Sequence, residues 1–118
     1  MLTVLLFNEC INNQDIEGLV RLMTENYTLI CDGHVDTRDK KTGRQAWSAF
    51  FKDFTDYKNI FTRVESVEDF VVIAGHSTCS NDDLNGPALW SARVVDDLVA
   101  KWQVYEDNGT NRKKLGLT

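Results

Sequence analysis

Three successive apolar stretches decide the fold: FVVIAGHSTC at residues 70–79, ALWSARVV at 88–95 and LVAKWQVYE at 98–106. Each stretch is rich in β-branched and aromatic residues, which favour strands. Residues 59–67 have a similar character, and a tight turn at Glu68-Asp69 separates them from the first stretch. The sequence therefore predicts four consecutive strands that pair antiparallel as a meander.

The chain before this meander has helical periodicity. Residues 2–13 carry a wide apolar face, which includes Leu2 and Leu6 as well as Phe7. Asp15 is suited to cap a second helix. The apolar residues of that second helix recur at the i, i+3, i+4 and i+7 positions: Ile16, Leu19, Val20 and Met23.

A strand and a third helix complete the first half of the chain. Residues 27–32 are strand-like, and residues 33–41 form a short strand or a loop. Thr42-Gly43-Arg44-Gln45 fits a capping box, so we expect the third helix to start behind Thr42. We interpret its aromatic stripe as core packing, and the alternative is a ligand-binding face. The stripe consists of Trp47, Phe50, Phe51 and Phe54.

Composition indicates an ordinary globular domain. The 118 residues are 42% hydrophobic and match the size of one domain, which we assign to residues 1–118. Helices precede strands, so the fold class is α+β rather than alternating α/β. The net charge of −5 argues against a nucleic-acid partner. We interpret the one basic run, Arg112-Lys113-Lys114, as a solvated tail.

Cysteine usage bears on compartment and metal chemistry. Cys10, Cys31 and Cys79 lie far apart and match no zinc or redox motif, so we expect buried, reduced thiols and no metal. No stretch is long enough to span a membrane, and the apolar N-terminus is a poor signal peptide. We therefore predict a cytoplasmic protein with no cofactor and no membrane partner.

Three segments carry a resemblance to a known family. They are Asn13–Leu19 with its helix break and Asp15, Gly43–Trp47 at the start of a helix, and Asp96–Gln103 at the last turn and strand. In this order they resemble the nuclear transport factor 2-like superfamily, in particular its SnoaL-like branch, which includes polyketide cyclases. The resemblance implies a cone-shaped fold, in which a curved antiparallel sheet packs on three helices around a pocket. It also implies a homodimer.

The sequence departs from that family at two positions that matter for chemistry. The turn before the last strand is Asp96-Asp97, where the family usually has Asp-Gly. Gln103 follows the tryptophan of the last strand, where SnoaL-like proteins often have an acid. An amide is neither a general acid nor a general base at neutral pH, which weakens the expectation of cyclase chemistry.

Asp32, His34 and His76 are the candidate catalytic residues. In an extended strand Asp32 and His34 point the same way, which suits a general-base pair or, with Asp36 and Asp39, a metal site. The alternative for this group is a hydrated, charged loop. His76 lies in mid-strand, where a histidine is either a pocket acid or base or a core residue held by one hydrogen bond.

Tyr27, Arg93 and Trp102 are the candidate ligand-binding residues. If the last hairpin turns at Asp96-Asp97, Arg93 shares the more apolar face with Trp102, and Trp90 lies on the opposite face. Arg93 would then hold an anionic ligand. An added residue in the turn would reverse these pairings. The alternative for Arg93 is a dimer contact on the convex face of the sheet. Tyr27 or Tyr57 with Asp32 imitates a ketosteroid isomerase site only loosely.

The leading functional hypothesis is a small-molecule-binding SnoaL-like domain with an apolar pocket. Its ligand is expected to be a small apolar or weakly acidic molecule. The first alternative is an isomerase, cyclase or epoxide hydrolase that uses a pocket Asp or His. The second is a protein-interaction module that uses the sheet surface.

Overall fold

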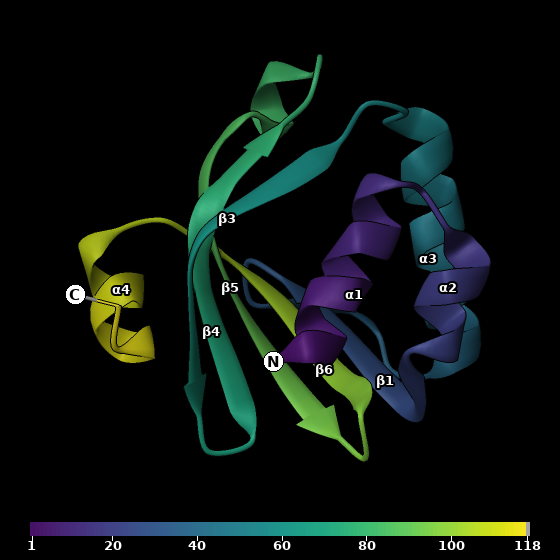
Figure 1. The fold of residues 1–118 in the computed structure, drawn as a ribbon. Helices are drawn as coiled ribbons and strands as arrows, with labels where there is room; N and C mark the ends of the chain where they lie inside the picture. The colour runs from purple at the N-terminus through teal and green to yellow at the C-terminus, as the bar shows by residue number, and fades with distance from the viewer. Residues whose placement is uncertain (118) are drawn as a thin grey trace.

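A computed structural model describes residues 1–117 and shows four α-helices and a curved six-stranded sheet (Figure 1). The α+β class is confirmed. In chain order the elements are α1 Leu2–Asn12, α2 Ile16–Arg21, β1 Met23–Cys31, β2 His34–Thr37, α3 Lys40–Asp53, β3 Lys58–Val67, β4 Phe70–Thr78, the 3-10 helix η1 Asp82–Leu84, β5 Gly86–Val95, β6 Leu98–Glu106 and α4 Gly109–Leu115.

The sheet has the strand order β2-β1-β6-β5-β4-β3. The meander from β3 to β6 is antiparallel, as predicted. The sheet as a whole is mixed rather than purely antiparallel, because β1 runs parallel to β6. The end of α2 joins this pair, since the backbone N–H of Val99 donates to the Leu22 carbonyl at 2.6 Å.

Two element starts differ from the sequence prediction. The third helix, α3, begins at Lys40 and is capped by Asp39, not by Thr42. The Asp39 carboxylate accepts hydrogen bonds from the backbone N–H of Thr42 at 2.7 Å and from its hydroxyl at 2.8 Å. Asp39, three residues before Thr42, thus satisfies the Thr42 backbone N–H, which has no partner within the helix. Thr42 itself lies inside the first turn of α3. β1 begins at Met23 rather than Tyr27.

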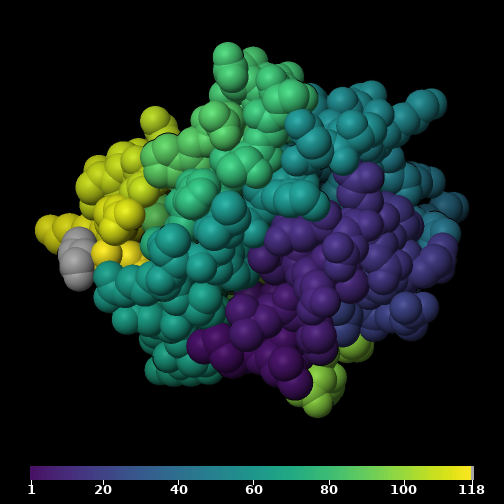
Figure 2. Space-filling view, turned by 45° about the horizontal axis from the view of Figure 1, so that its top comes forward, coloured from purple at the N-terminus to yellow at the C-terminus, as the bar shows by residue number. Residues whose placement is uncertain are grey.

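Three helices, α1, α2 and α3, cover one face of the sheet, which we call the inner face (Figure 1). Only one stripe of α1 is buried there, formed by Val4, Phe7 and Ile11. Leu2 and Leu6 are exposed, so the buried face of α1 is narrower than predicted. In Figure 2 α1 lies between strand residues on one side and residues of α2 and β1 on the other.

The core beneath these helices is aromatic. The Phe7 ring packs on Trp102 with ring centroids 4.8 Å apart, and on Tyr27 at 6.0 Å. Trp47 and Phe51 of α3 are buried against the same cluster, so their interpretation as core residues is confirmed. Large rings at this density exclude water and fix the distance between helices and sheet.

A fourth helix, α4, covers the opposite face, which we call the outer face (Figure 1). Leu117 follows α4 and is only 1% exposed, because it packs on Val72, Ala74 and Leu89. The predicted tail is instead a helix docked on the sheet, although Lys113 and Lys114 are exposed to solvent as predicted. The prediction rested on the charge and the polar neighbours of this run, whereas apolar side chains of β4 and β5 provide a surface on which the segment docks.

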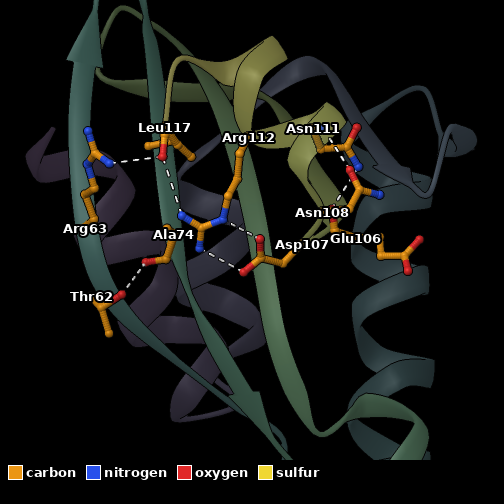
Figure 3. Close-up of polar contacts among 9 residues, drawn as sticks. All are labelled: Thr62, Arg63, Ala74, Glu106, Asp107, Asn108, Asn111, Arg112 and Leu117. Atoms are coloured by element: carbon orange, nitrogen blue, oxygen red, sulfur yellow. Dashed lines mark hydrogen bonds and ion pairs between the residues drawn. The ribbon is translucent and has the colours of Figure 1, made fainter.

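Polar contacts hold α4 in place (Figure 3). Arg112 pairs with Asp107 through two hydrogen bonds of 2.6 and 2.9 Å. Arg63 of β3 donates to the Leu117 carbonyl at 3.1 Å. The Asn108 side chain caps the helix by accepting from the backbone N–H of Asn111 at 2.8 Å. Planar, charge-assisted pairs of this kind fix orientation as well as position.

The last hairpin turns at Asp96-Asp97, as predicted, but its strands pair differently from the expectation. Both turn residues have positive φ, 52° and 63°, as a two-residue turn with right-handed twist requires. The register then shifts between Arg93 and Val94, so that Arg93 pairs with Lys101. The extra residue is Ala100, a β-bulge that turns every side chain beyond it to the other face.

Candidate functional site

A cavity of about 230 Å³ opens beside α3, between the turn from β1 to β2 and η1. Most of the side chains around it are apolar, and the few polar ones lie at the rim or at the Tyr57 end. Its lining consists of Leu29, Cys31, Asp32, Asp36, Ala46, Trp47, Phe50, Tyr57, Leu84 and Val104.

Helix and strand periodicity bring this lining together. Ala46 and Phe50 are one helical turn apart on α3, so they face the same side, with Trp47 beside them. Leu29 and Cys31 are two residues apart on β1 and project from the same side of the strand. The cavity therefore lies where the aromatic stripe of α3 overhangs the inner face of β1.

Asp32 and Asp36 provide the carboxylates of the cavity. Asp32 lies in the turn between β1 and β2, with a φ of 51°, and Gly33 follows it. Both aspartates are exposed, so they form the rim of the cavity rather than its floor. Burial, and then the adjacent Asp36 carboxylate, raise the pKa of the Cys31 thiol to about 12. Cys31 is therefore a neutral thiol at physiological pH and a poor nucleophile.

A chain of hydrogen bonds leads inward from Tyr57. The Tyr57 hydroxyl lies 3.2 Å from the Ser77 hydroxyl, and Ser77 donates to Oδ1 of Asn59 at 2.8 Å. All three residues are buried. Burial raises the pKa of Tyr57, so the phenol is neutral at physiological pH. This polar chain fixes the orientation of the Tyr57 hydroxyl within the otherwise apolar surroundings.

Trp47 and Tyr27 form a second buried hydrogen bond. The Trp47 indole N–H donates to the Tyr27 hydroxyl at 3.1 Å. Burial raises the pKa of Tyr27 well above its ordinary value. Tyr27 is fully buried behind Trp47 and is not among the residues that line the cavity. The structure therefore places this predicted ligand-binding residue in the core.

The other predicted ligand-binding residues are also away from the cavity. Trp102 is fully buried in the aromatic core. Arg93 lies on the outer face, where its guanidinium pairs with Asp69 at 3.1 Å. The prediction that Arg93 shares a face with Trp102 is wrong, because the bulge at Ala100 reverses the two faces.

The three predicted catalytic residues are not brought together. Asp32 lines the cavity, whereas His34 is an exposed residue of β2 that lies outside the lining. His76 pairs in the ladder with Ile60 and Pro87, and its side chain is on the outer face. Asp32 turns the chain instead of continuing the strand, so it does not share a strand face with His34. His76 is separate because it lies on β4 with its side chain on the outer face.

Several residues in or next to the cavity were not predicted from the sequence. Ala46 and Leu84 carry no chemical signature, and nothing in the sequence indicates that η1 brings Leu84 beside α3. Ser77 and Asn59 lie on adjacent paired strands, and their approach depends on the register of β3 with β4. Ser77 lies between His76 and Thr78, and Asn59 lies between Lys58 and Ile60, so no alternation of polar and apolar residues marks either side chain as inward-pointing.

Other hollows of the surface are shallower. One of about 310 Å³ lies between α1 and α2, and another of about 370 Å³ lies on the outer face beside Arg93. Both are open grooves with mixed polar lining. Among residues 1–117, no group of His, Cys, Asp or Glu side chains is arranged to hold a metal ion. None of the helices described combines the length and apolarity needed to cross a bilayer.

Comparison of this geometry with solved structures supports the fold. A candidate polyketide cyclase from Sinorhizobium meliloti superposes with a TM-score of 0.79 at 12% identity, covering 88% of this chain and 94% of that one. A cystatin fold protein from Novosphingobium aromaticivorans gives 0.76 at 18% identity, covering 88% and 95%. An epoxide hydrolase from Mycobacterium tuberculosis gives 0.76 at 13% identity, covering 96% and 86%.

Comparison at the level of sequence identifies the family. The curated proteins with which the sequence was compared include no match. The sequence pattern of the SnoaL-like domain matches residues 4–108, which is most of the chain. Because it covers well over half of the sequence, this match shows that the chain belongs to the SnoaL-like domain family.

Proposed function

We propose that this chain binds a small, mainly apolar molecule in the cavity beside α3. The observation that carries the proposal is the cavity lining itself, in which aromatic and aliphatic side chains surround a few fixed polar groups. This combination is typical of small-molecule sites, where apolar area provides affinity and polar groups provide orientation. The cavity volume of about 230 Å³ suits a molecule of one or two rings.

Binding is favoured over catalysis as the function of this cavity. The solved neighbours include a candidate polyketide cyclase and an epoxide hydrolase, and both names refer to reactions of small organic molecules. Fold similarity alone does not transfer an activity. In this chain Asp32 is the one predicted catalytic residue in the lining.

The experiment fills the cavity from α3. Ala46 lines the cavity, whereas Ala49 of the same helix is exposed to solvent, so the variants Ala46→Trp and Ala49→Trp form a matched pair. Binding of one- and two-ring aromatic alcohols, amines, ketones and acids is measured by thermal shift and calorimetric titration. We expect the wild type and Ala49→Trp to bind at least one of these probes, with Ala46→Trp at least ten-fold weaker. Equal binding by Ala46→Trp, or no binding of any probe, would overturn the proposal.

A further inference from the structure

We infer that the cavity recognises its ligand through a hydrogen-bond donor, a hydroxyl or an amino group, because the free polar side chains of the lining are acceptors. This inference rests on the proposed function and adds the chemical class of the ligand. Three groups determine it: the Tyr57 hydroxyl, the Trp47 indole, and the aspartate pair Asp32 and Asp36.

The Tyr57 hydroxyl has already used its proton. The Asn59 amide is oriented with Oδ1 toward Ser77 and with Nδ2 buried without a partner. In this orientation the Ser77 hydroxyl donates its only proton to Oδ1 across the 2.8 Å contact. In the 3.2 Å contact with Tyr57, Ser77 can then only accept, and Tyr57 is the donor. The phenol oxygen keeps lone pairs but no free hydrogen, so it offers an acceptor to a ligand.

The strong donor of the lining is occupied as well. The indole N–H of Trp47 points to the Tyr27 hydroxyl, with a nitrogen–oxygen distance of 3.1 Å, in a buried contact. A tryptophan has no other polar hydrogen. The thiol of Cys31 remains as a weak donor, and it lies beside the Asp36 carboxylate. A ligand carbonyl or ether oxygen would therefore find no strong side-chain donor in this lining.

The rim adds further acceptors and negative charge. Asp32 and Asp36 line the cavity, and no ion pair among residues 1–117 involves either of them. No lysine or arginine is part of the described lining. A carboxylate ligand would approach two like charges with no compensating cation, and a buried polar group without a partner weakens binding. Alcohols, phenols and amines satisfy these acceptors.

The first experiment varies one substituent on a constant ring system. The four probes are 2-naphthalenemethanol, 2-naphthylmethylamine, 2-acetonaphthone and 2-naphthoate, and calorimetric titration measures each dissociation constant. We expect the alcohol and the amine to bind at least ten-fold more tightly than the ketone and the carboxylate. The variant Asp32→Asn removes one negative charge from the rim, and it should weaken binding of the amine more than binding of the alcohol.

The outcomes distinguish the two proposals. If the ketone or carboxylate binds as tightly as the alcohol, and Ala46→Trp still abolishes binding, the donor inference is overturned while the proposed function stands. If none of the four probes binds, the proposed function fails and the donor inference fails with it.

The second experiment tests the direction of the Tyr57 hydrogen bond. Ser77→Ala removes the acceptor that holds the Tyr57 proton, so the phenol becomes free to donate to a ligand. The ketone should then bind several-fold more tightly than it binds the wild type, while the alcohol changes little. Tyr57→Phe keeps the ring but removes the oxygen, and it should weaken the alcohol about five-fold, the effect of one hydrogen bond.

These variants also exclude a merely structural role for the hydroxyl chain. A general loss of packing would weaken all four probes together, whereas the inference requires tighter binding of the ketone and little change for the alcohol in Ser77→Ala. An unchanged ratio of ketone to alcohol affinity in Ser77→Ala would overturn the inferred proton direction. Tyr57→Phe is nearly isosteric, so it provides the test if Ser77→Ala unfolds.

Discussion

The two faces of the sheet are covered by different means. On the inner face three helices bury a cluster of large aromatic rings, and the cavity remains at its edge. On the outer face one short helix covers a few small side chains, and charged hydrogen bonds hold it there (Figure 3). Adjacent residues of the same strands serve both faces, because side chains alternate along a strand. Packing of aromatic rings thus stabilises the inner face, whereas hydrogen bonds between charged side chains hold α4 on the outer face.

This difference has a consequence for function. Large rings pack into a rigid frame but rarely fill a curved space completely, so the inner face is where a cavity persists. On the outer face the Leu117 side chain is buried against the sheet, and the hollows that remain there are open surface grooves.

Removing the central ring of the inner face should have the largest effect. Trp102→Ala deletes a fully buried side chain that packs on Phe7 and Phe61. We expect the free energy of unfolding to fall by about 3–5 kcal/mol, a range typical of Trp deletions in a core. Urea unfolding followed by circular dichroism measures this loss. A loss below that of the outer-face variant described next would contradict the ranking of the two faces.

Truncation on the outer face should be smaller and local. Leu117→Ala removes the side chain that α4 uses to dock on Val72 and Leu89. We expect a loss of about 2 kcal/mol, at the low end for a buried leucine, because only α4 needs to detach. Hydrogen exchange should accelerate in α4 and leave the amides of α1 and β1 unchanged. Equal acceleration in all elements would show that the two faces are not independent.

A pair of glycines compares the free space on the two faces. A Cβ on Gly43 of α3 would lie 2.7 Å from Cδ2 of the Tyr27 ring and 3.2 Å from the Met23 sulfur. The Gly43→Ala variant should therefore lose about 1–2 kcal/mol of stability, although alanine favours helices.

Gly109 of α4 is the matched control, since a Cβ there meets no heavy atom within 4 Å. Gly109→Ala should be neutral or stabilise by about 0.5 kcal/mol. Thermal unfolding of both variants gives the two values. A stabilised Gly43→Ala variant would show that Tyr27 yields easily and that the inner face is looser than described.

The smallest effect should appear at acid pH on the outer face. The hydrogen bond from Arg112, with its charge, lowers the pKa of Asp107 below its ordinary value near 4. A lowered folded-state pKa stabilises the protein above the unfolded pKa, and this contribution disappears as pH falls from about 4 through the folded pKa.

Nuclear magnetic resonance shifts of the α4 amides should therefore change as the pH falls below about 4. In Asp107→Asn this step should be absent, and α4 should already be loosened at neutral pH. An identical acid transition in wild type and Asp107→Asn would assign it to other carboxylates.

Sequence patterns predicted the elements of the meander because their physical signals are local. The β-branched strands and the turn at Asp96-Asp97 are set by neighbouring residues, and the structure confirms them. The face assignment of Arg93 failed for a different reason. One bulge residue, Ala100, inverts all pairings beyond it, and no property of an alanine marks it as a bulge.

The cavity was harder to predict than the fold. Asp32 was identified as a candidate, and it does line the cavity. The partners of Tyr57 are set by the register between β3 and β4 and by the position of η1, which are tertiary properties. Contacts between distant segments thus decide the site, whereas the sequence reports mainly local preferences.

The parallel pairing of β1 with β6 also has a kinetic meaning. β1 is made early in synthesis, yet its partner on one side is β6, the last strand along the chain. The same separation appears at the Thr3 hydroxyl, which donates to the Asp97 carbonyl 94 positions along the chain. Contacts of such long range slow folding, because a large loop must close before they form. During synthesis on the ribosome, one edge of β1 therefore remains unpaired until β6 emerges. An unpaired strand edge favours aggregation, so the nascent chain is prone to aggregate during this interval.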